Sequence, residues 1–209
     1  MQPELLTAIF TGLAVMLGWG FADFFAKKTV DQVGSIVSLV WAHLFGTLFF
    51  TAIALYQLVV NNHQIDIPTT LYSWGGLIFF GTLQMVVYLF VYEGFGKGKL
   101  SLLNPVFASY SGIVALLSVL FFGETLSSGL IVALAIIFSG ILLLNLDTEA
   151  LKIKRLSFTN TPGLKEVVMA ALLAAFWTIY WDRFVSDQDW LSYALFMYAF
   201  MTVAAFAIA

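Results

Sequence analysis

The sequence predicts an all-α polytopic membrane protein, on two observations. Of its 209 residues, 61% are hydrophobic and only 10% are charged, whereas soluble domains average about 45 to 50% apolar and about 25% charged. The apolar residues also fall into seven runs with almost no charged residue, each near the roughly 20 residues with which a helix crosses a bilayer core. Such a chain cannot cover its surface with polar groups in water, which excludes soluble enzymes and nucleic-acid-binding proteins.

Charged or turn-forming residues bound each predicted span. The first run could be taken for a signal peptide, but it lacks a basic leader and an A-x-A cleavage pattern, so we predict a retained span. The residues that close the first six spans are, in order, Lys27, Asn61, Glu93, Gly123, Asp147 and Asp182. The seven predicted spans are residues 5–26, 37–60, 71–92, 102–122, 130–146, 167–181 (extending toward 184) and 191–209.

Lysine and arginine are unevenly distributed between the two sides of the predicted membrane. Assigning alternate connectors to alternate sides puts eight basic residues on one side and only Arg183 on the other. Basic residues favour the cytoplasmic side, so the count predicts a multi-pass plasma-membrane protein with its N terminus outside. The eight are Lys27, Lys28, Lys97, Lys99, Lys152, Lys154, Arg155 and Lys165.

The end of the chain is similar to its beginning. Trp19 in the first span and Trp177 in the sixth align at an offset of 177 − 19 = 158 residues, and the same offset places the seventh span on the second. Five spans per repeat is an odd number, so the second repeat would be inverted, as in many secondary transporters. We therefore expect a five-helix inverted-repeat transporter fold, with one repeat complete and the second partial.

This division predicts three segments. Residues 1–147 form the first five-helix repeat, residues 148–164 a cytoplasmic linker, and residues 165–209 the first two helices of the second repeat. Two full repeats would need roughly 300 residues. We therefore expect the chain to be part of a longer protein.

Short motifs within the first repeat carry a family resemblance. In chain order they are Gly18-Trp19-Gly20, Phe24-Phe25-Ala26-Lys27, Gly96-Lys97-Gly98-Lys99-Leu100-Ser101, Pro105, Leu116-Leu117-Ser118, Gly123-Glu124-Thr125-Leu126 and Ser139-Gly140-Ile141-Leu142. Together they resemble the ten-span EamA-type members of the drug/metabolite transporter superfamily. The chain departs from that pattern at Ala133, where a glycine is frequent. It also lacks, at residues 14–16, the acidic residue of the small four-span multidrug members.

The resemblance implies a function in transport. It implies a secondary transporter that moves small organic solutes, namely amino acids, metabolites or drug-like compounds, by alternating access. Several family members keep both termini in the cytoplasm, an orientation opposite to the one that the lysine count predicts for the N terminus. The implied partners are the lipid bilayer and a small-molecule substrate, with proton coupling left open.

Asp23 is the only acidic residue within the first span, one helical turn from Trp19 and one turn before Lys27. An intramembrane ionisable residue is a candidate functional residue. Asp23 would then recognise or exchange a cation or a proton, and Trp19 would line the same path. The alternative is an interfacial ion pair between Asp23 and Lys27.

The second and third spans contribute three further candidates. His43 lies deep in the second span with Thr47 and Thr51 on its face. Its role would be either that of a proton relay or that of a hydrogen-bonding residue between helices. Gln84 and Tyr88 share one stripe of the third span. The Gln84 amide would be costly facing lipid, so it should point into the bundle, either to bind substrate or to bond a neighbouring helix.

Small and polar residues form a stripe along the fourth span. They are Ser101, Asn104, Ala108, Ser111, Ala115 and Ser118, whose spacing places them on one helix face. Asn104 and Ser111 could line a solute cavity, or the stripe could allow close helix packing. Pro105 lacks an N–H and is either a first-turn proline or a kink that lines the path.

Two other functions are alternatives to transport. An intramembrane enzyme is the least favoured, because the sequence contains no G-x-G-D, H-E-x-x-H or G-x-S-x-G pattern. The other is a non-transporting membrane fragment or a structural or assembly subunit, which would form a homo-oligomer if the 209-residue chain is the natural product. No cofactor, metal or nucleic-acid partner is expected.

Overall fold

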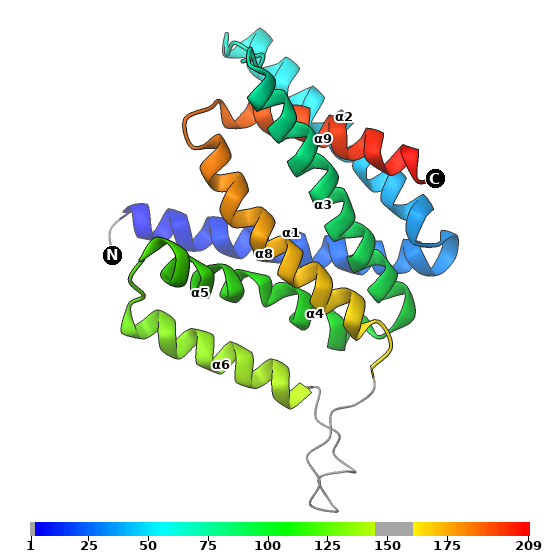
Figure 1. Cartoon of the computed structure of the whole chain (residues 1–209), viewed down its shortest axis with the longest axis vertical. Helices are drawn as coiled ribbons and strands as arrows, with labels where there is room; N and C mark the ends of the chain where they lie inside the picture. Colours follow the sequence, from blue (N-terminus) through cyan, green and yellow to red (C-terminus); the bar gives the residue numbers. More distant parts are fainter. Residues whose placement is uncertain (1–2, 145–160) are drawn as a thin grey trace, which may run out of the picture.

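The computed structural model describes residues 3–144 and 161–209, and every regular element in these two ranges is helical (Figure 1). This confirms the all-α prediction. The helices are α1 (Pro3–Val33), α2 (Ser35–Val60), α3 (Leu71–Lys97), α4 (Leu100–Ala108), α5 (Tyr110–Phe122), α6 (Ser128–Leu144), α8 (Leu164–Val185) and α9 (Trp190–Ala207).

Each of the seven predicted apolar runs coincides with a helical segment. Among the described residues, six helical segments are long and apolar enough to cross a membrane, and α4 and α5 together form one of them. The helix α6 is apolar but has 17 residues, which at 1.5 Å per residue gives about 25 Å. Most of the predicted linker, with Lys152, Lys154 and Arg155, lies outside the described residues.

The helix α1 continues beyond its predicted end. The apolar run stops before Lys27, but the helix extends to Val33. Lys27 Nζ pairs with Asp31 Oδ1, four residues later, at 2.6 Å. This spacing places both side chains on one helix face. The extra turns are therefore helical but polar, and a search for apolar runs does not find them.

Local turn chemistry sets several helix ends. Gly34, with φ of 84°, separates α1 from α2, and Gly123 ends α5 in the left-handed conformation. Such conformations favour glycine because it has no Cβ. Thr70 begins α3 by accepting a hydrogen bond from the Ser73 N–H at 3.0 Å, and Asp189 caps α9 in the same way from the Ser192 N–H at 2.9 Å.

The bundle centres on α3, α8 and α9. The helix α2 packs along α9, α3 packs against both α8 and α9, and α4 and α5 lie along α8 (Figure 1). The largest fully buried side chains include Leu77, Phe95, Tyr193 and Met201. The helix α1 contacts α2, α3 and α4 and is the least buried of the candidate spans.

Hydrogen bonds and glycines hold these helices together. Thr47 Oγ1 on α2 donates to the Tyr198 carbonyl on α9 at 2.9 Å, and Trp177 Nε1 on α8 donates to the Phe80 carbonyl on α3 at 3.0 Å. At Gly81, an added Cβ would lie 2.8 Å from the Met197 carbonyl of α9. Glycine at this position therefore allows α3 and α9 to approach closely.

Charged residues lie at both ends of the bundle. Lys97 Nζ at the end of α3 lies 2.9 Å from Glu166 Oε1 at the start of α8 and 3.2 Å from Glu93 Oε2. At the opposite end, Arg183 lies over the Phe122 ring, 3.4 Å from its centroid, and 3.8 Å from Glu124 Oε1. The lysine side and the Arg183 side are thus opposite ends of one bundle.

Candidate functional site

Adjoining cavities share the side chain of Trp19, and three of them together contain most of the predicted residues. The first, of about 470 Å³, lies between α1 and the α4–α5 segment. The second, of about 310 Å³, extends between α3, α8 and α9. The third, of about 180 Å³, lies between α1, α2 and α3 and also contacts α9. Residues from helices far apart in the sequence therefore surround one tryptophan.

Asp23 and Asn104 meet in the first cavity. Asp23 is only 7% exposed, and its carboxylate accepts a hydrogen bond from the Asn104 side chain. Ser111 lines the same cavity, together with Tyr110. Asn104 and Ser111 thus occupy the cavity-lining positions predicted from the stripe on the fourth span.

The predicted alternative for Asp23, an interfacial ion pair with Lys27, is wrong. Lys27 pairs with Asp31 instead, and Asp23 has no ion pair with any described residue. The physical reason is helix geometry. The helix α1 turns Asp23 toward α4 and continues beyond Lys27, so a second carboxylate comes within reach of the lysine on a polar face.

Aromatic rings connect the cavities. Tyr88 lies parallel to Trp19, with ring centroids 6.5 Å apart and 4° between the ring planes. The His43 ring packs edge-on against Tyr88 at 5.6 Å, and Tyr92 follows at 6.3 Å from Tyr88. Tyr88 on α3 therefore contacts candidates on α1 and α2, which the sequence alone did not bring together.

His43 and Gln84 each have a buried polar atom without a partner. His43 is 4% exposed, and among the described residues neither its Nε2 nor Gln84 Oε1 has a hydrogen-bond partner. Thr47, on the predicted face of His43, bonds to α9 rather than to the imidazole. Neither of these two atoms makes the hydrogen bond between helices that was one of the two predicted roles of His43 and Gln84.

Pro105 does not line any of the three cavities described above. It lies inside α4 rather than in its first turn, so the first-turn alternative is wrong. The helix breaks four residues later, where the Ser109 N–H bonds to the carbonyls of Pro105 and Val106 at 3.2 and 3.3 Å. The structure thus has a break next to the cavity, between α4 and α5.

Seven of the eight predicted residues line these cavities, all except Pro105. Sequence reasoning missed other aromatic residues of the walls. Trp177 was noted only as a marker of the repeat, and Tyr110 lay beside the predicted stripe. Tyr198 was not singled out, because α9 has no charged residue and few polar ones to mark one of its faces. The missed lining residues also include Phe50, Phe107, Trp181 and Trp190.

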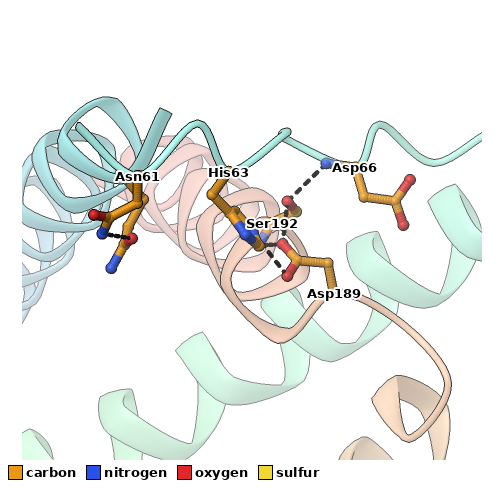
Figure 2. Close-up of polar contacts among 6 residues, drawn as sticks. Asn61, His63, Asp66, Asp189 and Ser192 are labelled. Carbon is orange, nitrogen blue, oxygen red and sulfur yellow. Dashed lines mark hydrogen bonds and ion pairs between the residues drawn. The ribbon is translucent and has the colours of Figure 1, made fainter. Parts of the chain in front are cut away.

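A second polar cluster, drawn in Figure 2, joins the connector between α2 and α3 to the start of α9 and lines none of the three cavities. His63, in the connector between α2 and α3, has its Nε2 3.0 Å from Asp189 Oδ1. The Ser192 hydroxyl donates to Asp189 Oδ2 and accepts from the Asp66 N–H at 2.9 Å. Burial alone would raise the pKa of Asp189, but the hydrogen bonds from Ser192 and His63 hold it below its ordinary value.

This cluster is a clamp rather than an arrangement for nucleophilic catalysis. In a catalytic triad the histidine lies between the acid and the hydroxyl, because it must take the proton of the hydroxyl. Here Asp189 lies between His63 and Ser192, and the hydroxyl donates to the carboxylate. The contacts instead tie the connector at residues 61–70 to the start of α9.

Comparison with known proteins gives a family and one relative. The model of the EamA-like transporter family matches residues 6–146. An uncharacterized protein of Methanocaldococcus jannaschii is 28% identical over 142 residues, which is 68% of this chain and 98% of that relative. No solved structure matches the chain.

Proposed function

Because the chain belongs to the EamA-like transporter family, within the drug/metabolite transporter superfamily, we propose that it moves small organic solutes by alternating access. Amino acids, metabolites and drug-like compounds are the solute classes considered. The three cavities around Trp19 are the proposed solute site. The observation that carries this proposal is the convergence of predicted residues from α1, α2, α3 and α4–α5 on those cavities.

The position of the cavities supports the proposal. Trp19, Gln84 and Trp177 lie near the middle of their spans, Ile9–Val33, Leu71–Lys97 and Leu164–Val185. Solute sites of secondary transporters lie near the bilayer midplane, often beside interrupted helices. The break at Ser109 provides such an interruption and a place where the segment can bend.

The division into repeats is part of the same proposal. Residues 1–147 would form one repeat, residues 148–164 a linker, and α8 and α9 the counterparts of α1 and α2. The two tryptophans aligned by the repeat, Trp19 and Trp177, line the same 310 Å³ cavity, as expected for equivalent positions on either side of a pseudo-two-fold axis. The relative of M. jannaschii, 98% of which is matched over 142 residues, has about the length of one repeat.

The proposed location is the plasma membrane, with the N terminus outside. The lysines at the ends of α1 and α3 and at the start of α8 lie on one side of the bundle, and Arg183 lies on the other. Because basic residues favour the cytoplasm, the lysine side would be cytoplasmic.

Transport by the purified chain in proteoliposomes tests this function. Uptake of a panel of radiolabelled amino acids, amines and amphiphilic drugs would be measured with and without a pH gradient. We expect uptake of at least one solute above that of empty liposomes, and a dependence on the gradient if transport is coupled to protons. Folded protein that transports none of the panel would contradict the proposal.

A pair of tryptophan variants connects transport to the cavities. Trp19→Leu removes the shared wall and should reduce uptake at least tenfold. Trp41→Leu is the matched control, because Trp41 on α2 is 53% exposed and lines none of the three cavities. Equal losses in the two variants would argue against these cavities as the solute path.

A further inference from the structure

The walls of the three cavities have an uneven charge. Among their lining residues, Asp23 is the only carboxylate, and none is a lysine or an arginine. The other ionisable lining residues are His43 and tyrosines. A solute with a negative charge would therefore find no cation in the walls to compensate the loss of water.

Three of the basic residues contact other side chains instead of Asp23. Lys27 pairs with Asp31, Lys97 bridges Glu93 and Glu166 at the lysine end, and Arg183 lies over Phe122 at the opposite end. The Asp23 carboxylate has only the amide of Asn104 as a hydrogen-bond donor among the described residues. A buried carboxylate without a counter-charge favours a bound cation as its partner.

Aromatic rings surround this carboxylate. Asp23 shares the 180 Å³ cavity with Trp19, Tyr88 and Tyr92 and the 470 Å³ cavity with Tyr110. Ring faces attract ammonium groups, most strongly where water is excluded, so carboxylate and rings favour the same sign of charge.

We propose that the Asp23 cavity selects small organic monocations, with the ammonium group against Asp23 and the apolar body in the neighbouring aromatic cavity. The inference rests on the proposed transport function and names its substrate class. The walls of the larger aromatic cavity, among them Trp177, Trp181 and Tyr198, would hold an aryl or alkyl group. Its volume of about 310 Å³ leaves room for one aromatic ring with a short chain.

A series of probes with one aryl body and different charges tests the sign of the charge. The probes are phenethylamine and its trimethylammonium derivative as cations, 2-phenylethanol as the neutral analogue, phenylalanine as the zwitterion and 3-phenylpropionate as the anion. Binding to the full chain in detergent would be followed by tryptophan fluorescence, and transport in proteoliposomes. We expect both cations to bind at least tenfold more tightly than the other three probes.

Two isosteric variants test the role of the carboxylate. Asp23→Asn should reduce the affinity for the cations at least tenfold and leave that for 2-phenylethanol unchanged. Asp31→Asn is the matched control, since Asp31 lies on the same helix but is exposed and paired with Lys27, and it should bind like the wild type. Circular dichroism would verify that both variants are helical. If a variant fails to fold, the probe series on the wild type still tests the proposal.

The outcomes separate this inference from the proposed function. If 2-phenylethanol or phenylalanine is bound or transported as well as the cations, or if Asp23→Asn binds cations like the wild type, cation selection is overturned while transport stands. If folded protein neither binds nor transports any probe or any solute of the wider panel, both are overturned. Charge-selective binding that is lost only in Asp23→Asn supports the inference.

Discussion

At the scale of single residues, Asp189 has the most contacts to lose. Its carboxylate accepts hydrogen bonds from the Ser192 N–H, which caps α9, and from the Ser192 hydroxyl. It also contacts His63 in the connector at residues 61–70 (Figure 2). Asp189→Ala removes all three contacts, and the loss of an N-cap alone costs about 1 kcal/mol. We expect a measurably lower thermal midpoint for purified Asp189→Ala, with Asp187→Ala, in the turn between α8 and α9, as the control.

The charge of Asp189 also gives a pH-dependent contribution to stability. Its folded pKa is lower than the ordinary 3.8, so its stabilising effect is complete above the unfolded pKa. The effect is lost as the pH falls through the folded value. Asp189→Asn keeps a capping oxygen but does not titrate. Thermal unfolding between about pH 3 and pH 7 should show the wild type losing its advantage over this variant at the acidic end; a constant difference would contradict this assignment.

At the scale of the helices, the crossing of α3 and α8 depends on backbone contact at the lysine end. Gly163 precedes α8 with φ of 84°, and a Cβ there would overlap the Gly94 carbonyl of α3. A side chain costs about 1 to 3 kcal/mol in that conformation, before the overlap is counted. Gly163→Ala should therefore lower the free energy of unfolding by about 2 kcal/mol or more, measured by denaturant titration in detergent.

The control for this prediction lies on α1. A Cβ at Gly12 would meet nothing within 4 Å, and alanine is the better helix former. Gly12→Ala should leave stability unchanged or raise it. If Gly163→Ala changed stability as little as Gly12→Ala, that result would contradict the backbone contact between Gly163 and Gly94.

At the scale of the whole molecule, the separation of basic residues predicts a sidedness that can be read directly. The chain has no cysteine, so one introduced cysteine is a unique label. Gln32 and Gln64 are both exposed, in the last turn of α1 and in the connector between α2 and α3. In intact cells a membrane-impermeant maleimide should label Gln64→Cys, and label Gln32→Cys only after permeabilisation. The reverse pattern would put the N terminus inside.

The positions of the spans could be predicted from the sequence because a bilayer imposes a length and excludes charge. The same criterion failed at Lys27, where α1 continues as polar helix. Within the cavities, Asp23 and Gln84 were predictable because a polar group in a span must turn away from lipid. Tyr198 was not, since its helix has no charged residue and few polar ones to mark one face. Its place in the cavity follows from packing against α2, whose residues lie about 150 positions earlier.

That separation also imposes an order of assembly in time. The Thr47 hydroxyl bonds to the Tyr198 carbonyl and the Thr202 hydroxyl, 151 and 155 residues further along the chain. At a synthesis rate of about 5 to 20 residues per second, the ribosome takes roughly 10 to 30 s to make that partner. The helix α2 must therefore remain inserted in lipid, with its face for α9 uncovered, until α9 arrives.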